Sequence, residues 1–153
     1  MVYFCCSEFL LRKFNNRNLY RIRREQFAYI QDQLSCDTDS LLQCLLDIFQ
    51  EKALAEISGF QVAAAAVGFS GDVYMGVNLE TPLSNLGKTI HAEQFVIANA
   101  HTCKEPGLRR FLVTEFPCGH CRQFLNELPE PENITIEVPD RNITLGECHT
   151  LPH

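Results

Sequence analysis

The sequence lacks the features that define several classes of protein. Its longest apolar run, residues 62–69, has eight residues, whereas a helix that crosses a bilayer needs about 18, so we expect no transmembrane helix. Glycine and proline account for only 8 and 7 of the 153 residues, which excludes collagen-like and proline-rich filaments. The first residues contain no basic segment before a short apolar stretch, which Glu8 interrupts. We therefore expect no secretory signal and a cytoplasmic protein.

The composition indicates one folded domain with an acidic body. Hydrophobic residues make up 46% of the chain, which is enough for a core in a chain of this length. The net charge of −6 is the sum of +5 in residues 1–24 and −11 in the remainder. An acidic body repels long polyanions and disfavours nucleic acid as its partner. We interpret the basic head as a solvated helix face, with a nucleic-acid contact or an organellar address as alternatives.

The hydrophobic periodicity predicts an alternation of helices and strands. Apolar residues recur at helical spacing over residues 19–34 and again over residues 41–54. Two runs rich in valine and alanine flank a glycine-bearing turn, which predicts a β-hairpin over residues 60–80. Beyond the hairpin we expect, in chain order, helix 89–100, strand 110–115, helix 118–128 and strand 134–138. This order indicates an α/β fold in which helices cover a mixed sheet.

Three soft metal ligands stand at the beginnings of two predicted helices. His91 opens one of these helices, and Cys118 and Cys121 open the other. The two cysteines are one helical turn apart, so both sulfurs lie on one side, and the positive end of the helix dipole favours thiolates. Three protein ligands leave a fourth position for water, as in catalytic zinc sites. We therefore expect one zinc ion per chain, held by His91, Cys118 and Cys121, rather than a redox or structural cysteine pair.

A carboxylate stands close to these ligands. Glu93 follows His91 by two residues, so at the start of a helix it can face the same cavity without binding the metal. Such a position suits a catalytic residue that moves protons between bound water and substrate. His120 lies between the two cysteines, but because water is needed at the open position we interpret it as a non-ligand. His-x-Glu together with Pro-Cys-x-x-Cys is the signature of zinc deaminases.

The similarity extends beyond this signature. Four segments follow in order: Gly59-Phe-Gln-Val-Ala, Gly76-Val-Asn-Leu-Glu, His91-Ala-Glu-Gln and Pro117-Cys-Gly-His-Cys-Arg-Gln-Phe-Leu-Asn-Glu. Over about residues 45–138 the chain resembles cytidine deaminase, and it is most similar to the longer, dimeric subclass of bacteria and plants. The resemblance implies a three-layer fold with a mixed central sheet of about five strands covered by helices. It also implies hydrolysis of cytidine or deoxycytidine by zinc-activated water, a reaction of pyrimidine salvage.

The resemblance further implies substrate contacts and an assembly. Asn78 and Glu80 match positions that bind a ribose hydroxyl, and Phe60 matches an aromatic residue near the base. Members of the family form homodimers or homotetramers with shared active sites. Residues 1–35, which the resemblance does not place, are expected to be a basic helical extension, and residues 36–153 the zinc catalytic domain. That domain is expected to be short at its C-terminus, because the longer subclass continues into a second, degenerate copy.

Three features favour two alternative functions. Ala63 stands where the family usually has glycine, which is expected to add a methyl group near the pocket floor. Together with the short C-terminus, it suggests a catalytically impaired relative that acts as a subunit or regulator. The basic head suggests instead a deaminase that edits cytosine in polynucleotides.

Overall fold

The computed structural model describes residues 20–81 and 86–150 of the chain. Within them the helices are α2 (Arg24–Leu34), α3 (Thr38–Gln50), α4 (Ala92–Thr102), α5 (Gly119–Asn126) and α6 (Leu145–Thr150), with short 3-10 turns at Leu86–Lys88 and Pro131–Asn133. The strands are β1 (Arg21–Ile22), β2 (Ala63–Gly68), β3 (Val73–Val77), β4 (Leu108–Val113), β5 (Thr135–Val138) and β6 (Arg141–Thr144).

All of these strands form one mixed sheet. Their order across the sheet is β1-β3-β2-β4-β5-β6. β4 and β5 pair in parallel through the α5 connection, whereas every other neighbouring pair is antiparallel. The predicted hairpin is confirmed as β2 and β3, in which Ala65 lies opposite Met75.

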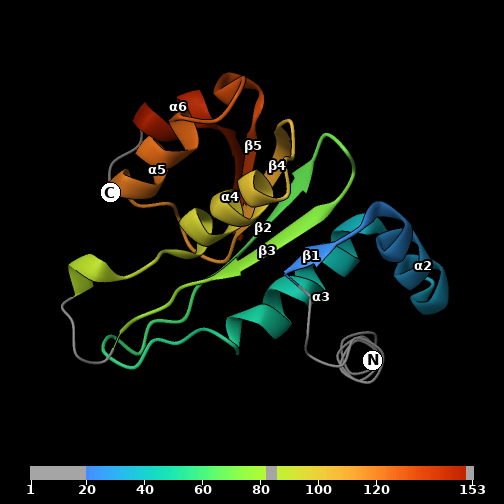
Figure 1. Ribbon diagram of the computed structural model, residues 1–153, viewed down its shortest axis with the longest axis horizontal. Coiled ribbons are helices and arrows are strands. Elements are labelled where there is room, and N and C mark those ends of the chain that lie inside the picture. The colour runs from blue at the N-terminus through green and yellow to red at the C-terminus, as the bar shows by residue number, and fades with distance from the viewer. Residues whose placement is uncertain (1–19, 82–85, 151–153) are drawn as a thin grey trace.

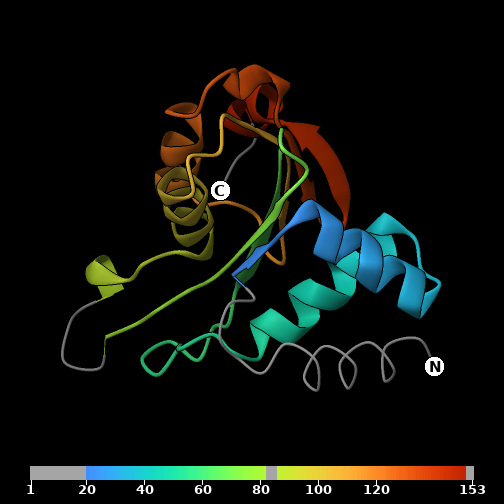
Figure 2. The same cartoon turned by 45° about the vertical axis from the view of Figure 1, so that its right-hand side comes forward.

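The sheet lies between two layers of helices. In Figures 1 and 2, α4, α5 and α6 cover one face, and α2 and α3 lie on the other side. Strand residues alternate between two buried clusters, because successive side chains point to opposite faces. Ala65, Met75 and Leu112 join the cluster beneath α3, whereas Tyr74 and Phe111 join the cluster beneath α4. The predicted α/β architecture is confirmed, with six strands instead of about five.

The N-terminal part of the described chain differs from its predicted form. The helix expected over residues 19–34 begins only at Arg24, because Arg21 and Ile22 pair with β3 as an edge strand. Phe27 and Ile30 of α2 are buried in the same cluster as α3. Most of the basic head, residues 1–19, lies outside the described residues.

α3 begins where its sequence provides a cap. The Asp37 side chain accepts a hydrogen bond from the Ser40 backbone N–H at 2.8 Å, which satisfies a donor that the first helical turn leaves free. The helix ends at Gln50, and a mostly exposed loop over residues 51–62 leads to β2. None of the described helices is long and apolar enough to cross a membrane.

Candidate zinc and substrate site

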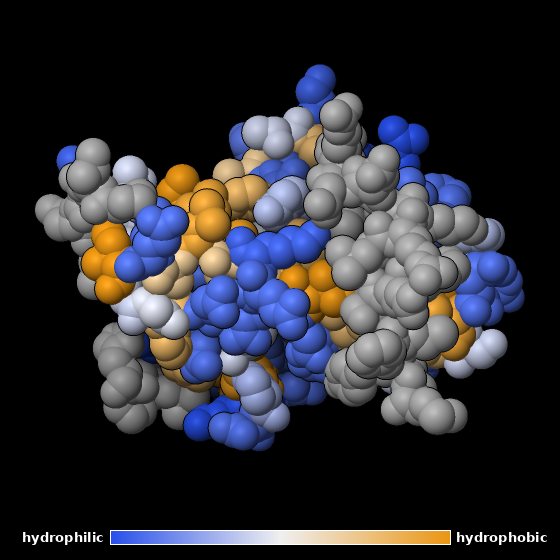
Figure 3. Space-filling view, turned by 90° about the horizontal axis from the view of Figure 1, so that it is seen from below, coloured by the Kyte–Doolittle hydropathy of each residue, from blue (hydrophilic) through white to orange (hydrophobic). Residues whose placement is uncertain are grey.

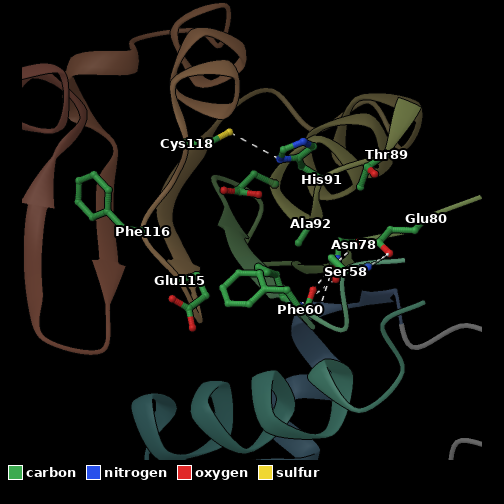
Figure 4. Close-up of a pocket in the computed structure, with 12 residues that line it drawn as sticks. Ser58, Phe60, Asn78, Glu80, Thr89, His91, Ala92, Glu115, Phe116 and Cys118 are labelled. Atoms are coloured by element: carbon green, nitrogen blue, oxygen red, sulfur yellow. Dashed lines mark hydrogen bonds between the residues drawn. The ribbon is translucent and has the colours of Figure 1, made fainter. Parts of the chain in front are cut away.

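The candidate site is a pocket at the end of the sheet where α4 and α5 begin. Its volume is about 310 Å³, and His91, Glu93 and Cys118 line its inner wall. Figure 4 shows His91 and Cys118 facing one another from α4 and α5, with Phe60 on the opposite wall. Both helices thus present their N-terminal ends to the pocket, as the sequence predicts.

The three predicted metal ligands lie together. One ligand atom from each of His91, Cys118 and Cys121 lies within 4.8 Å of the other two. The Nδ1 atom of His91 is 3.6 Å from the Sγ atom of Cys118. In a tetrahedral zinc site, Zn–N and Zn–S bonds of about 2.0 and 2.3 Å separate nitrogen from sulfur by roughly 3.5 Å, which is close to this distance. The group is therefore a zinc-binding set of one histidine and two cysteines, consistent with one zinc ion per chain.

The electrostatic environment of these ligands favours a bound cation. Cys121 is fully buried, and this burial, together with the neighbouring Glu93 carboxylate, raises the pKa of its thiol. A buried thiolate at this position needs a compensating charge, which a bound zinc ion supplies. Glu93 is only 4% exposed, and its burial raises the pKa of its carboxyl group. A raised carboxyl pKa is typical of a group that takes up and releases protons.

Side chains around the ligands form hydrogen bonds near the N-terminal ends of α4 and α5. The backbone N–H of His91 donates to Gln94 Oε1 at 3.1 Å, and Gln94 Nε2 lies 3.3 Å from the ring of His120. His120 is exposed and stands outside the ligand group found among the described residues. Arg122 is buried and donates to the Cys148 carbonyl oxygen, so it links α5 to α6.

Asn78 and Glu80 lie on the pocket wall just beyond β3, where they bind the loop that carries Phe60. Asn78 accepts the Val62 backbone N–H at 2.8 Å and donates to the Phe60 carbonyl at 2.9 Å. Glu80 is 6% exposed and accepts three hydrogen bonds from Ile57 and Ser58. The hydrogen bonds from Ser58, followed by that from Ile57, lower the pKa of the Glu80 carboxyl group. Glu80 is therefore an anion at neutral pH.

Several contributors to the pocket carried no recognisable signal in the sequence. Ser58, Thr89 and Glu115 also line it, but each is a common surface residue type that becomes informative only when its contacts are known.

Ala63 lies elsewhere than expected. Its side chain is fully buried in the cluster beneath α3, and its neighbour Val62 lines the pocket in its place. The expectation of a methyl group near the pocket floor is wrong, because the alternation along β2 turns Ala63 toward the opposite face of the sheet from α4.

The free cysteines in the described chain are Cys36, Cys103, Cys118, Cys121 and Cys148. Cys44 is disulfide-bonded and so is not one of them.

Comparison with known proteins identifies the family. The profile described as the cytidine and deoxycytidylate deaminase zinc-binding region matches residues 37–136, which include all three ligands and Glu93. The chain belongs to this deaminase family. Among curated members, the cytidine deaminase of Shewanella pealeana is 40% identical over 132 residues, which cover 86% of this chain and 44% of the relative. That of Pectobacterium carotovorum subsp. carotovorum is 45% identical over 117 residues, or 76% of this chain and 39% of the relative.

The fold of the family is also shared. The crystal structure of cytidine deaminase from Mycobacterium leprae matches with a TM-score of 0.65 and 25% identity, covering 77% of this chain and all of that one. The present chain spans less than half the length of the curated deaminases it matches.

Proposed function

We propose that the protein removes the amino group of cytidine or deoxycytidine by hydrolysis of the C4–N bond, which releases ammonia and the corresponding uracil nucleoside. The observation that carries this proposal is the placement of Glu93. Its buried carboxylate shares a pocket with the His91, Cys118 and Cys121 set, and that pocket has a wall of polar side chains able to bind a sugar.

In the proposed reaction each group has a separate task. Zinc, when bound by His91, Cys118 and Cys121, supplies polarisation of a water molecule. Glu93 takes a proton from this water and delivers protons to ring nitrogen N3 and to the departing amino group. Its low exposure of 4% keeps the transferred proton out of bulk solvent.

The far wall of the pocket suits the rest of a nucleoside. Phe60 presents an aromatic ring to the cavity (Figure 4), which suits contact with a pyrimidine base. Glu80 and Asn78 stand on one side of the ring, where a carboxylate and an amide can bind sugar hydroxyls. These positions support the contacts that the family resemblance implies.

The charges of the pocket favour a nucleoside over a phosphorylated substrate. Glu80, Glu93 and Glu115 line it, and within the described part of the chain no lysine or arginine does. Acidic side chains repel a phosphate group, which would find no arginine or lysine partner among the described lining residues. The N-terminal ends of α4 and α5, which could otherwise attract it, carry the proposed metal ligands. A polynucleotide substrate is disfavoured for the same reason.

A second copy of the chain is the proposed cover of this pocket. Phe60, which lines the pocket, is 54% exposed, and large hydrophobic side chains close in the chain to other lining residues are exposed as well: Ile57 by 42% and Ile90 by 46%. Leu54, which pairs with Leu79 between Asn78 and Glu80, is 54% exposed. In Figure 3, hydrophobic side chains gather at the end of the molecule that carries the loop between α3 and β2. Exposed apolar patches of this kind mark interaction sites. We therefore expect a homodimer or homotetramer in which each site is completed by its neighbour.

A substrate panel tests this function. Purified zinc-loaded protein is incubated with cytidine, with cytidine monophosphate and with a cytosine-containing single-stranded oligonucleotide, and conversion is followed by absorbance and by ammonia release. We expect turnover of cytidine alone. Conversion of the oligonucleotide with cytidine inert would indicate the editing alternative, and a zinc-loaded protein inert on all three would indicate a non-catalytic relative.

A further inference from the structure

One serine occupies a central place in the wall that is proposed to bind the sugar. The Ser58 hydroxyl donates to Glu80 Oε1 at 2.5 Å and accepts the backbone N–H of Phe60 at 3.0 Å. The backbone N–H groups of Ile57 and Ser58 donate to the other carboxylate oxygen, Oε2, at 2.7 and 3.0 Å. The Phe60 N–H fixes the acceptor side of the hydroxyl, so its proton points at Glu80.

The hydrogen-bond capacity of Glu80 shows where a ligand can bind. An ionised carboxylate offers about two acceptor sites on each oxygen. Among the described residues, both sites of Oε2 are taken by backbone N–H groups, whereas Oε1 accepts only the Ser58 hydroxyl. The open acceptor site of Glu80 therefore lies on Oε1, and the Ser58 hydroxyl determines which lone pair remains open.

We propose that Ser58 is a positioning residue for substrate, which orients Glu80 Oε1 to accept a hydroxyl of the sugar. This inference rests on the proposed function, because it assumes that a nucleoside fills the pocket. Ser58 itself is not required to touch the substrate. Without its hydroxyl, the Glu80 carboxylate keeps its two backbone donors but loses the contact that fixes Oε1.

The inference predicts a loss that depends on the sugar. In zinc-loaded protein carrying Glu93→Gln, which is expected to suppress turnover, the dissociation constants of cytidine and dideoxycytidine are measured by calorimetry with and without Ser58→Ala. We expect Ser58→Ala to raise the dissociation constant of cytidine about tenfold, in keeping with a lost hydrogen bond to a charged group. For dideoxycytidine, which lacks the hydroxyls that Glu80 would bind, we expect a change of less than about twofold. Ser58→Thr, which keeps the hydroxyl, should restore cytidine binding.

Ser70 provides a matched control. Its hydroxyl donates to Glu105 Oε2 at 2.5 Å and accepts the Asp72 N–H at 3.2 Å, and its backbone N–H donates to Glu105 Oε1 at 3.0 Å. Ser70→Ala thus removes the same kind of contact at the hairpin turn, outside the pocket, and should leave both constants unchanged.

Equal losses for the two ligands, or no loss for cytidine, would overturn the role of Ser58. Turnover of cytidine by the wild-type protein is measured separately. If cytidine binds with the expected dependence on Ser58 but is not converted, the proposed function fails and the positioning role stands.

Discussion

Gly76 determines how closely α4, and with it the candidate site, approaches the sheet. A methyl group at this position of β3 would lie 2.5 Å from the carbonyl oxygen of Ala92 and 2.9 Å from the backbone nitrogen of Val96. Ordinary contacts are about 3.5 Å or longer, so Gly76→Ala requires α4 to move by roughly 1 Å. Both atoms belong to the helix backbone, and no side-chain rotation relieves the clash. Overpacking costs about 1–3 kcal/mol, and we expect about 3 kcal/mol here.

Urea unfolding measures this loss. With a slope of about 2 kcal/mol per M, the midpoint of Gly76→Ala should fall by roughly 1.5 M. Gly146→Ala is the control, because the nearest atom to its added methyl group is 3.9 Å away and the residue lies in a helix. That change should be neutral or stabilising, by up to about 1 kcal/mol. A midpoint for Gly76→Ala equal to that of the wild type would refute the close contact between α4 and β3.

The same substitution should affect the metal ligands. α4 begins directly after His91, whose Nδ1 atom is 3.6 Å from Cys118 Sγ. A movement of about 1 Å exceeds the tolerance of about 0.2 Å for metal–ligand distances. Folded Gly76→Ala should therefore retain less zinc than Gly146→Ala after equal dialysis against a chelator.

Three further predictions concern the metal, the assembly and acid stability. Elemental analysis should find about one zinc per wild-type chain and almost none in Cys118→Ala, because two remaining ligands do not form a stable tetrahedral site; stoichiometric zinc in that variant would remove the proposed site. Specific activity and the molar mass measured by light scattering should fall together on dilution if a second chain covers the pocket, whereas a monomer with undiminished turnover would exclude a shared site. Because hydrogen bonds lower the pKa of Glu80 in the folded protein, its ionised form stabilises the fold above the unfolded pKa of about 4.3, and this contribution is lost as the pH falls through the folded value. The difference in urea midpoint between wild type and Glu80→Gln should therefore shrink from neutral to strongly acidic pH, and a constant difference would contradict the assigned contacts.

The parts of the fold predicted from sequence are those with strong local signals. The β2–β3 hairpin has two apolar runs around a glycine turn, and α3 has a dense apolar face behind its Asp37 cap. β1 was missed because two residues are too short to show a period of two. β6, residues Arg141–Thr144, has only one apolar residue and is mostly exposed. Its strand conformation comes from pairing with β5, which sequence periodicity does not contain.

The candidate site likewise contains residues that the sequence predicts and residues that it does not. His91, Cys118 and Cys121 were predictable because metal chemistry restricts both residue type and spacing. The contacts of Ser58 were not, because they join segments that are 22 residues apart and use a residue type that is common in loops. The predicted position of the Ala63 side chain was wrong because the face of the sheet to which it points depends on the register of β2. Pairing with β3 and β4 determines that register.

We propose that Glu93 moves protons on a cytosine nucleoside beside the His91, Cys118 and Cys121 set. The most direct test is the rate of cytidine deamination by wild type and Glu93→Gln at matched zinc content. We expect turnover by the wild type. In Glu93→Gln we expect an unchanged zinc content and a rate lower by about 10²–10⁴-fold, because the amide cannot carry the proton. Equal rates for the two proteins at equal zinc content would contradict it.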